Sequence, residues 1–496
     1  MTNTSLANES PKLSPRPETL RRPPSSGGLP WQLRLAIFAG LIIGAPFLFT
    51  TPVGQRGLLA LVWFGLLGML LVFSPRVGVS GLLVFLCVVG GMRRWLIPLL
   101  GWTSTDPLVL VAPAIAVLCL LNLLATRLLP RDTRLSRLLL WLLALMTLEI
   151  LNPMQGGISV GLAGILFYMV PILWYYLGRK YVSAALLERV FQVAIGVAVL
   201  ASMYGLYQTW FGFLPSELEW MRLSGMGALS VNGTTRALSF FTSPQEYGGF
   251  VGLAIVLLWV FCVRGNRAAL IPIPLLALAL FLESSRGAIV GTLAACTAVW
   301  AIQGRSLNSW IPRGILALVI AVVGLVWTLQ QAQNASFSTQ TQALVDHQTQ
   351  GLLDPANAKT STAGIHSAMV GNGILEGFKN PVGRGLGATT IAAGKFDGTN
   401  GGSTEMDISN MFASLGFIGG FLYAGIIGMA LFKAFRFWHL TRTTAALCIL
   451  AVLLLNVGQW INGQLYAAVF IIWVSIGVLD RMQADWVRTP RVSRAE

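Results

Sequence analysis

The sequence predicts an all-α polytopic membrane protein with about 14 transmembrane helices. Of its 496 residues, 55% are hydrophobic and only 11% are charged, whereas about a quarter of the residues in a soluble domain are charged. Apolar stretches long enough to cross a bilayer, which takes about 20 residues, recur along the chain. Short polar and basic clusters separate these stretches, as loops between transmembrane helices do.

The apolar stretches define fourteen expected spans. They cover residues 33–50, 57–73, 78–92, 107–126, 137–151, 157–177, 186–211, 246–263, 268–282, 287–303, 314–330, 410–435, 443–461 and 464–480. The stretch 78–92 is short for a full crossing. Two connections, 212–245 and 331–409, are too long to be simple turns, and long loops are often functional.

The distribution of basic residues predicts the orientation. With the N-terminus inside and the spans alternating, 24 of the 34 Lys and Arg residues fall in inner segments. The positive-inside rule therefore places both termini in the cytoplasm and the two long loops outside. The net charge of +15 does not indicate nucleic acid as a partner, because the cations lie in clusters between apolar spans.

The expected organisation follows from this count. Residues 1–30, rich in Pro, Ser and Arg, form a disordered cytoplasmic tail. Residues 31–330 carry spans 1–11 and the periplasmic loop 212–245, and residues 331–409 form the long, partly helical periplasmic loop. Spans 12–14 occupy 410–480, and 481–496 is a second cytoplasmic tail. The five cysteines lie in apolar spans without metal-ligand spacing, so neither a disulfide framework nor a zinc site is expected.

The first outer loop and the turn after span 268–282 carry charges at membrane depth, where ionisable groups are usually functional. Arg222 and Arg236 precede Ser243-Pro244, which is a typical helix start with Glu246 in its first turn. Glu246 is either a helix-dipole residue or part of an anion site at that N-terminus. Glu283-Ser284-Ser285-Arg286-Gly287 is either a tight turn, freed by Gly287 and with Glu283 paired to Arg286, or an anion site facing a cavity.

The second outer loop contains two of the three histidines. We expect an interfacial helical stretch from about 361 to 378 that carries His366. Gly383, Arg384, Gly385 and Gly387 follow, and these glycines let the backbone approach a ligand or a neighbouring helix. Glu405-Met406-Asp407 comes just before span 410–435, where its carboxylates either favour the helix N-terminus or act as a base or a sugar-hydroxyl acceptor pair.

Several of these motifs occur together in a familiar order. They are Asn152-Pro153-Met154-Gln155-Gly156-Gly157, Ser239 to Gly248, Ser285-Arg286-Gly287, the His366 to Gly387 segment, and Glu405-Met406-Asp407 with Gly416. Over roughly residues 135 to 480 the chain resembles the O-antigen ligase/polymerase superfamily of bacterial membrane proteins, and most closely its exopolysaccharide-polymerase-like members. The resemblance implies a GT-C-like fold and a glycosyltransferase that needs no metal or other cofactor. Its donor would be a glycan on a polyprenyl diphosphate such as undecaprenyl diphosphate.

The resemblance also implies roles for residues. Arginines thought to hold the diphosphate map onto Arg286, Arg236 and Arg384, which fits the forked donors that phosphate oxygens prefer. Many ligases of the family carry a catalytic histidine where this chain has Glu405-Met406-Asp407. The expected catalytic residues are Arg286, His366, Glu405 and Asp407, and the expected substrate-binding residues are Arg222, Arg236, Glu246, Ser285 and Arg384.

The expected function is a polysaccharide polymerase of the bacterial inner membrane, with its active site on the periplasmic face. It would transfer a growing glycan from its polyprenyl-diphosphate carrier to a lipid-linked repeat unit. Expected partners are the lipid-linked oligosaccharide, membrane lipid, and a chain-length regulator or other polysaccharide-assembly proteins. The alternatives are a ligase that transfers the glycan to lipid A-core or another acceptor, a membrane transporter, and a scaffold for other assembly enzymes.

Overall fold

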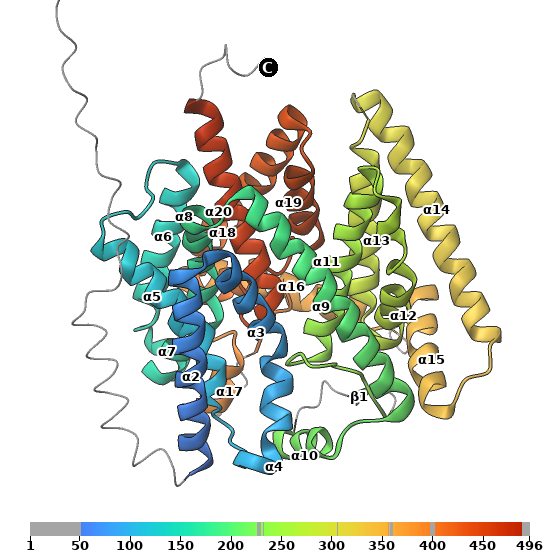
Figure 1. Cartoon of the computed structure of the whole chain (residues 1–496), viewed down its shortest axis with the longest axis horizontal. Helices are drawn as coiled ribbons and strands as arrows, with labels where there is room; N and C mark the ends of the chain where they lie inside the picture. Colours follow the sequence, from blue (N-terminus) through green and yellow to red (C-terminus); the bar gives the residue numbers. More distant parts are fainter. Residues whose placement is uncertain are drawn as a thin grey trace, which may run out of the picture. The chain divides into compact units, whose positions relative to one another are not determined.

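The part of the chain that the structure describes is almost entirely helical (Figure 1). This computed structural model describes residues 51–225, 230–231, 233–304, 306–355, 357, 361–396 and 402–488. The expected N-terminal tail, the first expected span at 33–50 and the last eight residues of the C-terminal tail lie outside these ranges. The all-α prediction is confirmed.

Within the described residues, nine helices are long and apolar enough to cross a membrane. They are α2 (Pro52–Phe73), α3 (Pro75–Trp95), η1 with α5 (Pro107–Leu110 and Val111–Ala125), α7 with η3 and α8 (Ile158–Gly164, Ile165–Met169 and Val170–Tyr181), α9 (Ala184–Phe211), α11 (Pro244–Val263), α14 (Leu307–Asn334), α18 (Asp407–Thr441) and α20 (Tyr466–Arg488). The protein is therefore a multi-pass membrane protein.

Four shorter helices also coincide with expected spans. They are α6 (Arg134–Glu149), α12 (Ile273–Glu283, preceded by the 3-10 turn Arg267–Leu270), α13 (Arg286–Ala301) and α19 (Thr444–Leu455). Every expected span after the first thus falls on a helix. The boundaries differ at several places. The stretch that looked short, 78–92, lies in a helix of 21 residues, whereas α12 has only 11 residues because Pro272 precedes its first turn.

Local sequence explains where these helices begin. The Ser243 side chain accepts a hydrogen bond of 3.2 Å from the Glu246 main-chain N–H, and Pro244 takes the first helical position. Thr51 and Pro52 start α2 in the same way. These residues satisfy amide groups that no helical carbonyl reaches. The predicted helix start at Ser243-Pro244 is confirmed.

Helix α18 contains a break that hydropathy does not reveal. Gly416 has φ 67° and ψ −174°, so α18 is two helical segments joined at this residue. A Cβ atom at Gly416 would lie 1.9 Å from the main-chain oxygen of Pro381. Glycine is required here both for its positive φ and for the close approach of the 381–383 backbone.

Helix α19 ends at Leu455, six residues earlier than expected, and residues 456–465 connect it to α20 without forming a helix. The backbone groups of this connection are bonded to other segments. Asp407 N–H donates to the Gly458 oxygen at 2.9 Å, and Gly463 N–H donates to the Phe167 oxygen at 2.9 Å. Non-helical backbone at such a position needs partners within the protein.

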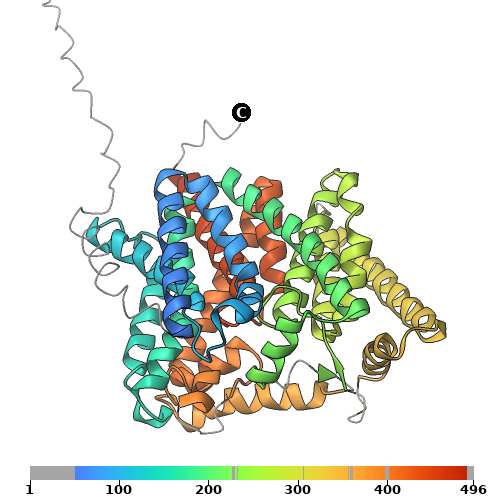
Figure 2. The ribbon, with the colours of Figure 1, turned by 60° about the horizontal axis from the view of Figure 1, so that its bottom comes forward.

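The two long connections gather at one end of the bundle. They contain α10 (Pro215–Ser224), the antiparallel strands β1 (Ser230–Val231) and β2 (Thr234–Thr235), α15 (Thr339–Leu353), α16 (Ala363–Lys379) and α17 (Ile391–Phe396). We call this the loop end. In Figure 2 the green α10 and the orange α16 and α17 lie along the lower edge, whereas the C-terminal end of α20 lies at the top, which we call the tail end. The short helix α4 (Ile97–Leu100) and the turn η2 (Pro153–Gln155) complete the fold.

The helices differ greatly in how much of their surface other helices cover. The apolar window of α20 is 78% buried and that of α11 is 72% buried, whereas the window of α14 is 6% buried. α11 and α20 therefore form the centre of the bundle, and α14 lies at its edge (Figure 1). An apolar helix that other helices leave uncovered faces lipid.

Candidate functional site

Arg236 and Glu283 form a buried ion pair at the loop end. Arg236 follows β2, and its guanidinium donates to a carboxylate oxygen of Glu283 and, at 3.0 Å, to the main-chain oxygen of that residue. The Glu283 side chain is fully buried against Gly248 of α11, and its other oxygen has no hydrogen-bond partner among the residues that the structure describes. The expected tight turn is present, since α12 ends at Glu283 and α13 begins at Arg286. The expected pairing of Glu283 with Arg286 is wrong, because Arg236 takes that place.

Arg286 begins α13 and lies against α15. Its Nη2 donates to the main-chain oxygen of His347 at 2.8 Å and lies 2.9 and 3.0 Å from the two ring nitrogens. Gly351, one helical turn further along α15, leaves room for the guanidinium, since a Cβ atom there would lie 2.0 Å from its carbon. Because a neutral imidazole has one acceptor nitrogen, Arg286 can donate to the main-chain oxygen and to one ring nitrogen of His347.

His347 is not among the site residues that the sequence predicts. Burial, and after it the positive charges of Arg286 and Arg236, lower the pKa of His347 from 6.5 to about 4. The ring is therefore neutral near pH 7 and accepts a hydrogen bond from the arginine. The sequence offers one indication of where His347 lies. Leu344, Val345 and Gln348, which are buried, are spaced as on one face of a helix, and His347 lies within the same helix.

The turn between α12 and α13 takes an unexpected conformation. Ser284, not Gly287, adopts positive φ, at 73°, and such a conformation is uncommon for a residue other than glycine. The expectation that Gly287 frees this turn is therefore wrong. Ser285 is the N-cap residue of α13, but its side chain makes no capping hydrogen bond. Ser285 thus lies between the Arg236–Glu283 ion pair and the Arg286–His347 contact, within the stretch that joins Glu283 to Arg286.

Glu246 joins two helices at the centre of the bundle. Its fully buried carboxylate accepts hydrogen bonds from the Thr242 N–H at 3.1 Å, the Thr242 hydroxyl at 2.5 Å and the Ala467 N–H at 3.2 Å. The last bond connects the first turn of α11 to the first turn of α20. The structure thus gives Glu246 a role at a helix N-terminus, as one of the two interpretations expected.

His366 and Glu405 come together at the surface of the loop end. Nδ1 of His366, on α16, lies 3.2 Å from Oε2 of Glu405, and both side chains are exposed to solvent. Glu405 has φ 79°, and its N–H donates to the Ser403 hydroxyl at 3.1 Å. A carboxylate on Nδ1 leaves Nε2 of the histidine as the nitrogen available to a substrate proton. The helix expected at 361–378 is confirmed as α16.

Asp407 lies two residues from Glu405 but faces the interior. Its Oδ2 accepts hydrogen bonds from the Ile461 N–H at 2.5 Å and the Asn462 N–H at 3.2 Å, and lies 3.4 Å from the Tyr423 hydroxyl. The side chain is fully buried. The structure therefore separates the two carboxylates, because only Glu405 is accessible to a substrate and Asp407 holds the connection between α19 and α20.

Arg384 lies on a glycine-rich segment packed against η2 and α18. Its N–H donates to the Ala413 oxygen at 3.0 Å, and its side chain is exposed and makes no ion pair with any described residue. Gly387 N–H donates to the Gln155 side chain at 3.1 Å, and Asn152 donates to the Gly383 oxygen at 3.1 Å. Two motifs more than 220 residues apart therefore meet, and the expected glycine-mediated approach to a neighbouring element is confirmed.

Arg222 stands apart from the other candidates. It lies on the exposed face of α10, where it forms two hydrogen bonds with Glu219, at 2.6 and 2.9 Å. These bonds lower the pKa of Glu219 from its usual value. Both side chains are well exposed, and such a pair contributes little to stability.

The contacts thus divide the candidates into two groups at the loop end. Arg236, Ser285 and Arg286 surround Glu283 and His347, whereas His366, Glu405, Asp407 and Arg384 lie on α16, α18 and the segments beside them. Among the described residues, Arg236 and Arg286 belong to the first group and Arg384 belongs to the second, so the structure brings together two of the three arginines. Among the described residues, no three His, Cys, Asp or Glu side chains form a possible metal site.

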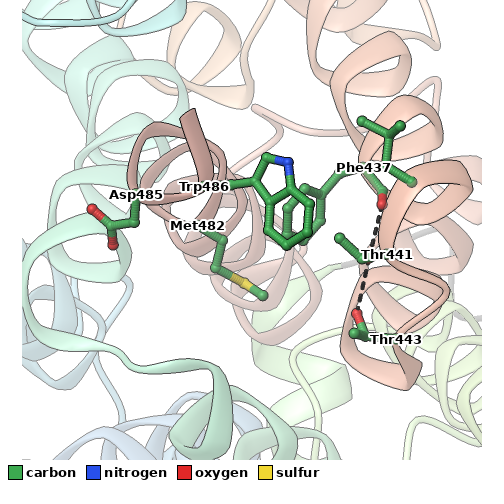
Figure 3. Close-up of a pocket in the computed structure, with 7 residues that line it drawn as sticks. Phe437, Thr441, Thr443, Met482, Asp485 and Trp486 are labelled. Carbon is green, nitrogen blue, oxygen red and sulfur yellow. Dashed lines mark hydrogen bonds between the residues drawn. The ribbon is translucent and has the colours of Figure 1, made fainter. Parts of the chain in front are cut away.

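One cavity lies at the other end of the molecule. It measures about 620 Å³ and is lined by Phe437, Leu440, Thr441, Thr443, Met482, Asp485 and Trp486. Figure 3 shows the Trp486 indole beside Phe437, which it contacts edge to face, and Thr441 near Thr443. The hydroxyls of Thr441 and Thr443 are hydrogen-bonded at 3.3 Å. The cavity is formed by the ends of α18 and α20 at the tail end, and none of the candidate residues lines it.

The described part of the chain is that of an all-α multi-pass membrane protein. Comparison with the known protein families and with curated proteins gave no match to this chain.

Proposed function

We propose that the protein is a glycosyltransferase of the bacterial cytoplasmic membrane that polymerises a glycan. It takes the growing glycan from a polyprenyl diphosphate and transfers it to a lipid-linked repeat unit at the extracytoplasmic face. The observation that carries this proposal is the exposed His366–Glu405 pair, which occurs at the same end of the molecule as Arg236, Arg286 and Arg384. A GT-C-like fold with about 14 spans and an N-in/C-in orientation belongs to the same proposal.

The chemistry assigns a role to each group. Nε2 of His366 takes the proton of the acceptor hydroxyl while the oxygen of that hydroxyl attacks the anomeric carbon of the donor glycan. The bond between that carbon and the diphosphate oxygen breaks, and its electron pair stays on the departing lipid diphosphate. Glu405 holds Nδ1 of His366, which orients the ring and stabilises the imidazolium that forms. The carboxylate of Asp407 faces inward and takes no part in this scheme.

The arginines stabilise the charge that develops on the diphosphate. Arg384 is exposed and open to a phosphate group. Arg286 already donates to the His347 oxygen and ring, so a phosphate that reaches it replaces these neutral acceptors by charged ones, which form stronger hydrogen bonds. Arg236 remains paired with Glu283 beside it and adds positive charge to the same region.

The test uses the purified protein in lipid nanodiscs with a single substrate, a polyprenyl-diphosphate-linked repeat unit. A ladder of products differing by one repeat unit is expected. Arg286→Ala should abolish the ladder, and His366→Ala should slow it by roughly a hundred- to ten-thousandfold, as for loss of a general base. Lys379→Ala, an exposed cation at the end of α16, is the matched control and should leave the ladder unchanged. Normal ladders from both Arg286→Ala and His366→Ala would refute the proposal.

A ligase uses the same donor groups and is the runner-up. It would leave the repeat unit unchanged when no other acceptor is present and would form product only when lipid A-core or another acceptor is added. A transporter would form no product in either case and would move the lipid-linked substrate across a sealed vesicle. The same substrate in the three assays therefore separates the three functions.

A further inference from the structure

The segment between Arg236 and α11 is held in place by two buried side chains from distant helices. Residues 237–241 have no regular secondary structure, and Ser239 has φ 50°. Positive φ is uncommon for serine and costs free energy, so the surroundings must impose it. Ala237, Leu238, Ser239 and Phe241 are all buried. This segment places Arg236 at one end and the N-terminus of α11 at the other.

Arg94, near the end of α3, makes the first set of these contacts. Its Nη1 donates to the Phe241 oxygen at 2.6 Å and its Nη2 donates to the Ser239 oxygen at 2.5 Å. The side chain is fully buried. Nε lies 3.5 Å from Glu217 of α10, whose carboxylate balances the charge, and the guanidinium lies 5.6 Å from the Trp220 ring centroid. The planar fork of arginine suits two carbonyls two residues apart.

Gln208, on α9, makes the second set. Its side-chain oxygen accepts from the Ser239 N–H at 2.7 Å and from the Leu238 N–H at 3.2 Å, and its amide donates to the Ser239 oxygen at 3.2 Å. Gln208 is also buried and bonds to Glu217 at 3.0 Å. Both polar groups of the Ser239 backbone are therefore fixed by side chains, which explains how its conformation is maintained.

The backbone of α3 approaches the same segment closely. Gly91 N–H donates to the Phe240 oxygen at 2.7 Å. A Cβ atom at Gly90 would lie 2.4 Å from the Phe241 carbonyl carbon. Glycine at residue 90 thus allows the contact that brings Arg94 within reach of residues 239 and 241.

We infer that Arg94 is a positioning residue for the diphosphate site. By fixing the main-chain oxygens of Ser239 and Phe241, it sets the path of the segment that begins at Arg236 and so keeps Arg236 beside Glu283. This inference rests on the proposed function, because it assumes that Arg236 contributes to binding a diphosphate. Arg94 itself is buried and contacts no substrate.

The contrast with Arg179, another buried arginine, supports a distinct role. Arg179, at the tail end, is paired with Asp480 and with Asp132 and fastens the ends of helices to each other. The shortest hydrogen bonds of Arg94 go instead to carbonyls of an irregular segment that leads directly to a candidate binding residue. Loss of Arg179 should therefore affect stability alone, whereas loss of Arg94 should also affect the geometry at Arg236.

The test is a double-mutant cycle on the affinity of the purified full-length protein for farnesyl diphosphate. Arg94→Lys keeps a charge facing Glu217 but cannot bond both carbonyls, and it should weaken binding about tenfold, as expected for the loss of one or two buried hydrogen bonds. Arg236→Ala should weaken binding as well. Because loss of Arg236 leaves the Glu283 carboxylate buried and unpaired, Arg236→Ala is combined with Glu283→Gln throughout the cycle if the single variant does not fold. In the Arg236→Ala background, Arg94→Lys should cause less than a twofold further loss, because it acts through Arg236. Arg179→Lys is the buried control and should leave the affinity unchanged.

The outcomes separate the inference from the function on which it rests. If Arg236→Ala weakens farnesyl diphosphate binding but Arg94→Lys does not, the positioning role alone is overturned. Fully additive losses of affinity would also overturn it, because they indicate general destabilisation. Normal binding by Arg236→Ala would refute the role of Arg236 in the proposed function. If Arg94→Lys does not fold, Gln208→Met replaces it in the cycle with the same expected result. Failure of both to fold, with Arg236→Ala folded, would make Arg94 structural and overturn the inference.

Discussion

At the scale of single residues, the loop end is dominated by charges that already have partners inside the protein. Glu283 illustrates the consequence, because its carboxylate is fully buried and Arg236 is its only ion-pair partner among the described residues. A buried charge that loses its partner is far more costly than a pair that is removed as a whole. The two ends of this pair are therefore not equivalent.

Arg236→Met should destabilise the protein more than Glu283→Gln. The first change leaves a buried, uncompensated carboxylate, for which a cost of about 3–5 kcal/mol is typical. The second leaves Arg236, whose side chain is 14% exposed, with the main-chain oxygen of residue 283 as an acceptor. Thermal unfolding in detergent should rank the two variants in this order, and the double variant should recover part of the loss. A lower melting temperature for Glu283→Gln would contradict this account of the pair.

His347 makes the docking of α15 depend on pH. Its pKa is about 4 in the folded protein and about 6.5 in an unfolded chain, so the unfolded chain binds more protons between these values. Its contribution to stability is therefore fully present above about pH 6.5 and is lost as the pH falls toward 4. Charged His347 would also face Arg286 and Arg236. After correction for the intrinsic pH dependence of amide exchange, the protection of residues 339–353 should be high at pH 7.5 and lower at pH 5.

The control for this pH effect is a histidine elsewhere in the chain. His347→Asn should remove most of the pH dependence, whereas His439→Asn, in the last turn of α18 at the tail end, should leave it intact. A pH dependence in 339–353 that survives His347→Asn would show that another group causes it.

At the scale of elements, hydropathy predicts the helices well because each must bury or shield its own backbone polar groups in lipid. It fails where tertiary contacts replace helical hydrogen bonds. The early end of α19 depends on the Asp407 contacts with residues 461 and 462, and no local signal shows these. For the same reason the sequence places Glu405 and Asp407 together as candidates, whereas packing exposes one and buries the other.

Pairing of charges was also beyond prediction from the sequence. Glu283 and Arg286 are three residues apart and therefore look like a pair, yet the left-handed conformation of Ser284 directs them to different partners. His366 and Glu405 were candidates for separate reasons, and only the packing of α16 beside α18 brings them to 3.2 Å. The sequence indicated which residue types matter, but their partners depend on contacts between distant segments.

The break in α18 gives a prediction about a whole element. Gly416→Ala should be severely destabilising, because its Cβ would lie 1.9 Å from the Pro381 oxygen and its φ of 67° is unfavourable for alanine. Gly425→Ala, in the same helix with nothing within 4 Å of the added atom, should be neutral or stabilise by up to about 1 kcal/mol. Yield and melting temperature in detergent check this, and equal behaviour of the two variants would disprove the role of the break.

At the scale of the whole molecule, the charges and the fold together predict which end of the protein faces the cytoplasm. The inner segments assigned from the sequence hold 24 of the 34 basic residues, and a basic excess in short loops marks the cytoplasmic side. Both long connections lie at the loop end, away from the end of α20 (Figure 2). If the rule holds for this chain, the loop end with His366 and Arg286 faces away from the cytoplasm, where lipid-linked repeat units are expected to be joined.

Single cysteines test this orientation in a variant whose five native cysteines are replaced. Ser224→Cys, on exposed α10 at the loop end, should react with a membrane-impermeant maleimide in cells whose cytoplasmic membrane is intact. Thr126→Cys, an exposed position just after α5, should react only after permeabilisation, because α5 ends on the side that the basic residues mark as cytoplasmic. The reverse pattern would place His366 and the arginines in the cytoplasm. Residues 331–409 would then be cytoplasmic, and the distribution of basic residues would no longer support a reaction at the extracytoplasmic face.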